Sequence, residues 1–189
     1  MGFLPDSYEA PAGSNKYMKF KDGNNEFRVL GNSIVGMELW INKKPVRHLM
    51  SQPFTRDELE QADTNDDGSV RRPKHFWAFP VIDMVDSTVK VLEVTQKSVQ
   101  DALRVYVEDS DWGDPKEYNV LVKRGGSGLE TSYNVIAKPK KELSPDEKVS
   151  WEDVKKKGFD VKELFTSGDP FSPVTKKSDE INIDDIPFN

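Results

Sequence analysis

The chain has 189 residues, a length that suits one domain with an extension. Charged residues make up 32% and apolar residues 35%, a composition polar enough for part of the chain to be disordered. Its net charge of −6 is unevenly distributed, since residues 1–141 carry 20 basic and 21 acidic side chains and residues 142–189 carry 7 and 12, so the body of the chain is nearly neutral. The sequence has no cysteine, two His and no apolar run of about 18 residues, which excludes disulfides and leads us to expect no metal, no other cofactor and no membrane span.

Residues 1–24 are rich in Gly, Asn, Ser and Pro and lack the basic and apolar stretches of a secretory signal, so we expect a flexible N-terminal arm. Two strands are predicted next, at residues 25–31 and 33–41, with a turn between them. In the second strand every other residue is apolar, which indicates one buried face. Its apolar positions are Val35, Met37, Leu39 and Ile41, and Trp40 lies on the opposite face.

Residues 42–75 form a long polar insertion. One short helix is predicted within it, from about Thr55 to Ala62, because Thr55 and Glu58 match the Ser/Thr-x-x-Glu capping box. The stretch from Asp63 opens like an EF-hand calcium loop, but its twelfth position is Lys74 instead of the bidentate Glu, so we expect plain turn chemistry there.

The second half of the body predicts two hairpins with a helix between them. The strands of the first hairpin are 75–83 and 87–95, and those of the second are 117–124 and 129–137, joined by the Gly-rich turn 125–128. The helix starts near Ser98, which we expect as its N-cap, and an apolar stripe at helical spacing supports it. That stripe comprises Val99, Ala102, Leu103 and Tyr106.

This order of elements is typical of a five-stranded OB-type barrel, if the first two short strands count as one bent strand. The barrel would span residues 25–141, with its one helix between strands 3 and 4, and residues 142–189 would be an acidic, largely disordered tail. Another small β-barrel or an α+β sheet remains an alternative. OB barrels bind oligonucleotides on the face of strands 2 and 3 and through the loops that join strands 1–2 and 4–5.

Basic side chains lie in both of these loops, at the two ends of the 42–75 insertion and beside the Gly-rich turn. Cations that follow a phosphate backbone, together with aromatic rings that stack on bases, are what single-stranded nucleic acid requires. We therefore expect a DNA-binding rim formed by Lys43, Lys44, Arg47, Arg71, Arg72, Lys74, Lys123 and Arg124.

Three aromatic residues are the candidates for stacking on bases: Trp40, Trp77 and Phe79. In the strand 75–83 both faces are apolar, with Phe76 on one face and Trp77 and Phe79 on the other, so one set must be exposed or covered by another segment. The alternative is that Trp77 and Phe79 belong to the core and Phe76 points outward.

Motifs of catalysis are missing from the sequence. It has no Walker loop, no dinucleotide-binding glycine fingerprint and no GxSxG elbow, and neither His is paired with a nucleophile in a recognisable pattern. We expect a binding protein and no enzyme.

The body resembles the single-stranded-DNA-binding proteins of tailed bacteriophages and, more remotely, the helix-destabilising protein of the T-even phages. The resemblance covers roughly residues 16–147 and rests on segments such as "KFKDGNNEFRVLGNSIVGMELW", "FWAFPVID" and "EDSDWGDPKEYNVLVKRGGSGLETSYNVIAKP". It implies an OB barrel that coats single-stranded DNA during phage replication, recombination and repair, in the cytoplasm of the infected bacterium. The T-even relative carries a structural zinc, which this chain cannot reproduce because it has no cysteine.

The C-terminus resembles the acidic tip "DDDIPF" of bacterial single-stranded-DNA-binding proteins. The matching residues are Asp184, Asp185, Ile186, Pro187 and Phe188, and Asn189 is an additional residue after the Phe. The resemblance implies that the tail recruits phage or host replication proteins. A solubilising extension, and a recruitment scaffold without direct DNA binding, are the alternative interpretations.

Overall fold

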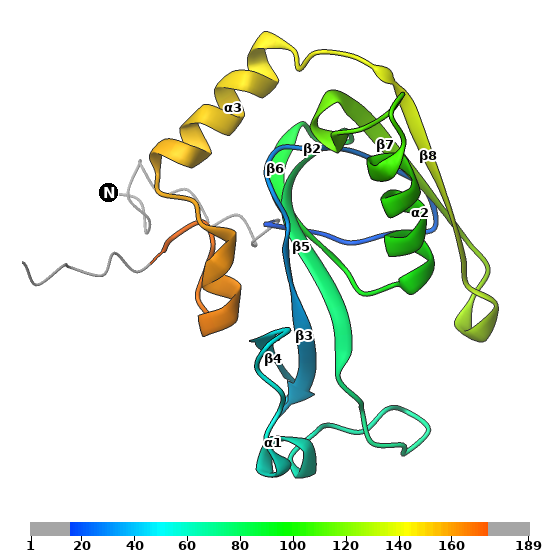
Figure 1. The fold of residues 1–189 in the computed structure, drawn as a ribbon, viewed down its shortest axis with the longest axis vertical. Coiled ribbons are helices and arrows are strands. Elements are labelled where there is room, and N and C mark those ends of the chain that lie inside the picture. The colour runs from blue at the N-terminus through cyan, green and yellow to red at the C-terminus, as the bar shows by residue number, and fades with distance from the viewer. Residues whose placement is uncertain (1–15, 174–189) are drawn as a thin grey trace, which may run out of the picture.

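The computed structural model describes residues 16–173, and its centre is one open, mixed β-sheet (Figure 1). The strand order is β1-β6-β5-β2-β7-β8, and β3 pairs with both β5 and β4. All pairs are antiparallel except β1 with β6. The strands are β1 Tyr17–Met18, β2 Gly23–Val29, β3 Ile34–Ile41, β4 Lys44–Leu49, β5 Lys74–Asp83, β6 Thr88–Val94, β7 Tyr118–Gly125 and β8 Ser132–Lys140.

The sheet does not close into a barrel within the described residues. β2 and β3 lie one after the other along the same edge of β5, and β2 continues to β7 and β8. The far edge of β6 is taken by β1, whereas β8 pairs with β7 alone. The prediction of a mainly β fold is confirmed, and the sheet is open between β1 and β8.

Two strands at the ends of the sheet contain a proline. Pro45 lies in β4 and Pro139 in β8, and each of these strands has one neighbour among the described residues. Proline removes a backbone N–H, so edge strands tolerate it best. The central strand β5 also contains a proline, Pro80, which stands between the segments of β5 that pair with β3 and with β2, and its carbonyl accepts a hydrogen bond from the Leu30 N–H at 2.9 Å.

The main core lies on the face of the sheet that α2 (Lys97–Glu108) covers. Phe27, Phe79, Val81 and Val120 are buried in it, and the helix contributes Val99 and Leu103. The predicted apolar stripe of this helix is thus confirmed, although the helix begins at Lys97 with Gln96 as its N-cap, so Ser98 is a helical residue. A Ser at the second helical position cannot cap, because its backbone is already helical.

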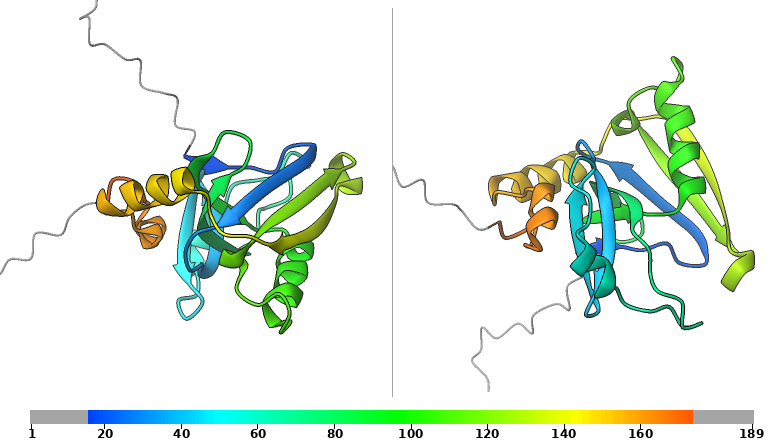
Figure 2. Two further views of the ribbon diagram at one scale, coloured as in Figure 1. Left: turned by 90° about the horizontal axis from the view of Figure 1, so that it is seen from above. Right: turned by 60° about the horizontal axis from the view of Figure 1, so that its bottom comes forward.

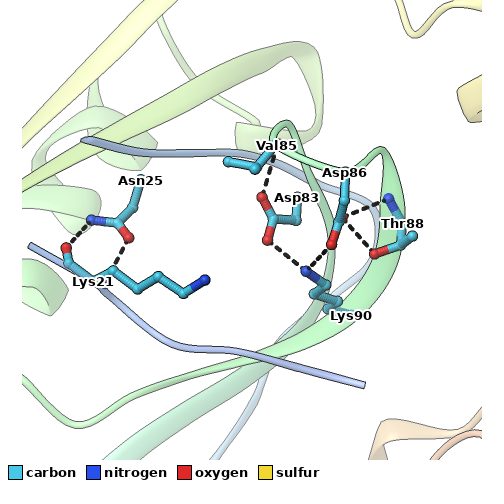
Figure 3. A network of polar contacts seen from close by, with 7 residues as sticks. All are labelled: Lys21, Asn25, Asp83, Val85, Asp86, Thr88 and Lys90. Atoms are coloured by element: carbon cyan, nitrogen blue, oxygen red, sulfur yellow. Dashed lines mark hydrogen bonds and ion pairs between the residues drawn. The ribbon is translucent and has the colours of Figure 1, made fainter. Parts of the chain in front are cut away.

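A polar network closes one end of this core (Figure 3). The buried ammonium of Lys90 donates to Asp83 at 2.7 Å and to Asp86 at 2.6 Å, which fixes the β5–β6 turn. Burial raises the pKa of Asp86, but hydrogen bonds from Lys90 and Thr88 outweigh it and lower that pKa to about 2. Beside this network, the Asn25 amide donates to the backbone carbonyls of Lys21 and Gly23 and to that of Val122 in β7.

The remaining short elements test the local predictions. The helix α1 (Arg56–Glu60) has the predicted capping box of Thr55 and Glu58. The 42–75 insertion is less irregular than predicted, because β4 forms a hairpin with β3. Two short 3-10 helices, η1 (Pro115–Glu117) and η2 (Gly128–Glu130), flank β7.

The N-terminal arm is shorter than predicted, since β1 pairs with β6 and Met18 is buried. Residues 1–15 lie outside the described residues.

The prediction of a largely disordered tail is wrong for residues 142–173. This part contains α3 (Pro145–Lys156), with a capping box of Ser144 and Glu147, and the 3-10 helix η3 (Val161–Thr166). Figure 2 shows α3 and η3 together on one side of the sheet, with α2 on the other. Residues 174–189 lie outside the described residues.

Residues 159–171, which we name the C-terminal cover, form a second core on the outer face of β5. Leu164 is buried there beside Phe76 and Ala78, and the rings of Phe76 and Phe165 are 6.0 Å apart. A side chain at Gly36 would come within 2.9 Å of the Phe165 ring, so this contact requires glycine. The apolar outer face of the 75–83 strand is therefore covered by a segment that follows it by about 80–95 residues.

Candidate nucleic-acid interface

The β3–β4 hairpin presents two of the predicted cations at its tip. Asn42 and Lys43 form a two-residue turn with φ of 52° and 60°, values that favour Gly or Asn. The carboxylate of Asp63 accepts a hydrogen bond from the backbone N–H of Lys43 at 2.7 Å and so ties the turn to the segment before β5. The side chains of Lys43 and Lys44 are exposed.

Trp40 lies on the outer face of the same hairpin, the face that carries the second core further along β5. The strand register places Glu38 opposite Lys74 and Trp40 opposite Pro45, so all four side chains share that face. The Trp40 ring is half-buried, its Nε1 donates to Glu38 Oε1 at 2.9 Å, and the guanidinium of Arg71 lies 5.6 Å from its centroid. We call Trp40, Pro45, Arg71 and Lys74 the Trp40 face.

Five of the predicted cations are available to an anion. Each is exposed and forms no ion pair with any residue between 16 and 173: Lys43, Lys44, Arg72, Lys74 and Lys123. Four of the five belong to the hairpin tip and to the strand segment beside the Trp40 face, so charge and an aromatic ring meet there.

Arg47 is the exception in the insertion, because its guanidinium is already occupied. Its side chain is 9% exposed, and Nη2 lies 3.0 Å from Glu38 Oε2 and 2.6 Å from Glu93 Oε2. We name Arg47, Glu38 and Glu93 the Arg47 cluster. The prediction that Arg47 is a loop cation facing DNA is wrong, since β4 turns it under the edge of the sheet, over the Phe76 ring.

The sequence carries a signal for this cluster in its two glutamates. Glu38 and Glu93 both stand inside apolar strands, where a carboxylate must find a partner. Burial, together with the neighbouring Glu38 carboxyl, raises the pKa of Glu93 to about 7 against the attraction of Arg47. One cation thus serves two buried carboxyl groups, and Glu93 is the one that takes up a proton near neutral pH.

The Glu93→Gln variant is expected to remove a pH dependence of stability. Glu93 binds its proton more tightly in the folded protein than its ordinary value of 4.5 allows, so its stabilising contribution is complete below about pH 4.5 and is lost as the pH rises through about 7. The free energy of unfolding of Glu93→Gln, relative to wild type, should therefore increase over this range in urea titrations.

The Asp86→Asn variant is the control of opposite sign. Because the pKa of Asp86 is lowered in the folded protein, its contribution to the free energy of unfolding is present above pH 3.8 and is lost as the pH falls towards about 2. The destabilisation caused by Asp86→Asn should therefore shrink in acid. A flat difference between Glu93→Gln and wild type from pH 4 to 8 would contradict a proton-binding Glu93.

Trp77 and Phe79 lie on the other face of β5, away from Trp40. Phe79 is 4% exposed and belongs to the main core, so the expectation that it offers a ring to a base is wrong. Trp77 is half-buried and lines a groove of about 710 Å³ between the start of β3, α2 and residues 113–116. The predicted stacking residues are thus divided between two faces of the sheet.

Lys123 and Arg124 do not join the Trp40 face either. They stand opposite Asn24 and Gly23 at the beginning of β2, and Arg124 pairs with Asp22 at 3.2 Å. The β7–β8 turn and the β3–β4 hairpin lie well apart in both Figure 1 and Figure 2. The expected convergence of three basic clusters is reduced to the two at the ends of the 42–75 insertion.

The predicted partner-binding tip, Asp184, Asp185, Ile186, Pro187 and Phe188, lies outside the described residues. Within residues 16–173, no helix is long and apolar enough to cross a membrane. Comparison with known proteins gives no match: no family model fits the chain, and it has significant similarity neither to a curated protein nor to a solved structure.

Proposed function

We propose that this chain binds single-stranded DNA without sequence preference and without catalysing a reaction, and that the strand lies across the Trp40 face. The observation that carries the proposal is the half-buried Trp40 ring, which is fixed by Glu38 and Arg71. It is bordered by exposed cations on β5 and at the hairpin tip, which form no ion pair within residues 16–173. A ring of this kind stacks on any base, and cations around it follow the phosphates.

The order of the elements supports an OB-type barrel that is partly open. With β2 and β3 counted as one bent strand, the described residues run strand, strand (β5), strand (β6), helix (α2), strand (β7) and strand (β8). The Trp40 face then comprises parts of strands 1 and 2 and of the loop between them. OB barrels bind oligonucleotides on the face of strands 2 and 3 and through the 1–2 and 4–5 loops, so strand 2 and the 1–2 loop are the parts that the two sites share.

The biological setting follows from the phage resemblance and is part of the proposal. The protein would protect single strands during phage DNA replication, recombination and repair in the cytoplasm of the infected bacterium. Its acidic C-terminal tip, Asp184 to Phe188, would recruit replication proteins of the phage or the host by an apolar anchor with charged neighbours.

The test is a fluorescence titration of the full chain with oligo-dT. Stacking on Trp40 should quench tryptophan emission, Trp40→Phe should remove most of that quenching, and Trp40→Ala should weaken binding by about 1–3 kcal/mol. Lys74→Ala should reduce the slope of log K against log salt by about 0.7, the value for one phosphate contact to a single strand.

Trp77→Phe is the matched control, because Trp77 is half-buried like Trp40 but lies on the opposite face. Its quenching should equal that of wild type. Quenching that disappears in Trp77→Phe and survives in Trp40→Phe would refute the Trp40 face. No binding of oligo-dT at low salt would refute DNA binding and leave the recruitment scaffold.

A further inference from the structure

A second groove, of about 550 Å³, lies at the opposite end of the sheet from the β3–β4 hairpin. It is bounded by the end of β8, by η1, by β2 and by the start of α3. Its basic lining residues are Arg28, Lys116, Lys140, Lys141 and Lys148, and its acidic ones are Glu117 and Glu142. The lining therefore carries five cations and two carboxylates, so it favours an anion.

Arg28 is the unusual member, because a guanidinium is rarely buried without a carboxylate. The residue is 2% exposed, Nε donates to Asn119 Oδ1 at 2.8 Å and Nη1 to the Lys116 carbonyl at 3.3 Å. No residue between 16 and 173 forms an ion pair with it. Since a guanidinium has five N–H groups, three are left for another acceptor.

The surroundings hold this side chain in place. Asn119 donates through Nδ2 to Glu26 at 2.9 Å, so its Oδ1 is directed at Arg28. Burial lowers the pKa of Arg28, and only the more distant charge of Glu147 opposes the shift. A fixed, desolvated guanidinium with spare donors binds the oxygens of a phosphate or carboxylate in a bidentate manner.

The lysines around Arg28 are exposed, and their ion pairs are weak. Lys116, Lys140 and Lys148 pair with Asp114, Glu117 and Glu142, but their side chains are 40–55% exposed, and exposed pairs of this kind contribute little and exchange easily. Lys141 is exposed and forms no ion pair within the described part of the chain. It is therefore ready to neutralise a second charge on the bound group.

We propose that this groove is a binding site for a phosphate group, with Arg28 as the fixed donor and Lys141 and Lys148 as the closing cations. The group is either free inorganic phosphate or a phosphodiester of a nucleic-acid strand. The site is separate from the Trp40 face and does not depend on DNA binding there.

The experiment is an NMR titration of the full chain with sodium phosphate at constant ionic strength. The side-chain Nε–H resonance of Arg28 and the amide of Lys141 should shift together and saturate. Arg28→Lys, which keeps the charge but loses the fork, and Lys141→Met should each weaken phosphate binding by about tenfold. Lys156→Met, which removes an exposed lysine on the last turn of α3, is the control and should change nothing.

Two results would overturn the proposal: no saturable shift at Arg28, or an equal loss of affinity in Lys156→Met. Should Arg28→Lys fail to fold, Lys141→Met and the Arg28 resonance of the wild type still decide. Oligo-dT then identifies the source, because a strand that occupies the groove displaces phosphate and a strand confined to the Trp40 face leaves it bound. Trp40→Phe should bind phosphate like wild type, so failure of DNA binding at that face is distinguishable from failure of this site.

Discussion

Replacing Arg47 with methionine is expected to lower the free energy of unfolding by about 3–5 kcal/mol at pH 8, because it leaves two buried carboxylates without their cation. The side chains of Glu38 and Glu93 are 5% and 21% exposed, so water replaces little of the lost attraction. The loss should be smaller at pH 5, where Glu93 is protonated. Urea unfolding at the two pH values measures both effects.

The control for Arg47→Met is Arg56→Met. Arg56 also pairs with a glutamate, Glu60, at 2.8 Å, but both side chains are largely exposed. Exposed helix pairs contribute about 0.3–0.5 kcal/mol, so this variant should unfold almost like wild type. Equal effects of the two substitutions would show that the Arg47 cluster is solvated in the folded protein.

Shortening Leu164 to alanine is expected to cost about 2–5 kcal/mol, the range for a buried Leu that leaves a cavity. Leu164 is 2% exposed between Phe76, Ala78 and the remainder of the C-terminal cover. The loss should appear as a shift of the single unfolding transition, because the second core shares β5 with the main core.

Leu129→Ala is the matched control, since Leu129 is fully exposed in η2 and its loss should change the free energy of unfolding by no more than about 0.5 kcal/mol. The contradicting result is a Leu164→Ala variant that keeps the global unfolding transition and only accelerates hydrogen exchange in residues 159–171. The C-terminal cover would then be a separately unfolding unit and no part of the core.

The local patterns of the sequence predicted the local structure well. The strand at 33–41, the helical stripe after Lys97 and the capping box at Thr55 all correspond to elements of the described residues. The buried face expected from the alternation in 33–41 is wrong in its first half, since Val35 is exposed and Ile34 and Gly36 are buried. Each of these signals depends on neighbours within a few positions, so one chain carries enough information for them.

The strand β4 escaped prediction for a reason that is also local. Pro45 and three basic residues obscure its alternation, and a proline argues against a strand unless the strand lies at an edge. Without β4, the pairing of Arg47 with Glu38 across the hairpin cannot be foreseen.

The C-terminal cover could not be assigned from its own sequence. Its apolar residues stand singly among charged ones, and they become a core only against Phe76 and Ile34, which lie more than 80 residues earlier. The sequence did show that both faces of the 75–83 strand are apolar, so the need for a covering segment was visible and the identity of the segment was not.

The prolines at the two ends of the sheet bear on how copies of the chain behave at high concentration. A second molecule that tried to extend the sheet would meet Pro45 beside Lys44, or Pro139 between Lys138 and Lys140, instead of a continuous row of N–H and C=O groups. Such ends discourage aggregation by strand addition. Copies of the chain that met at the β4 or β8 edge would therefore touch through side chains alone and could separate again without breaking backbone pairing.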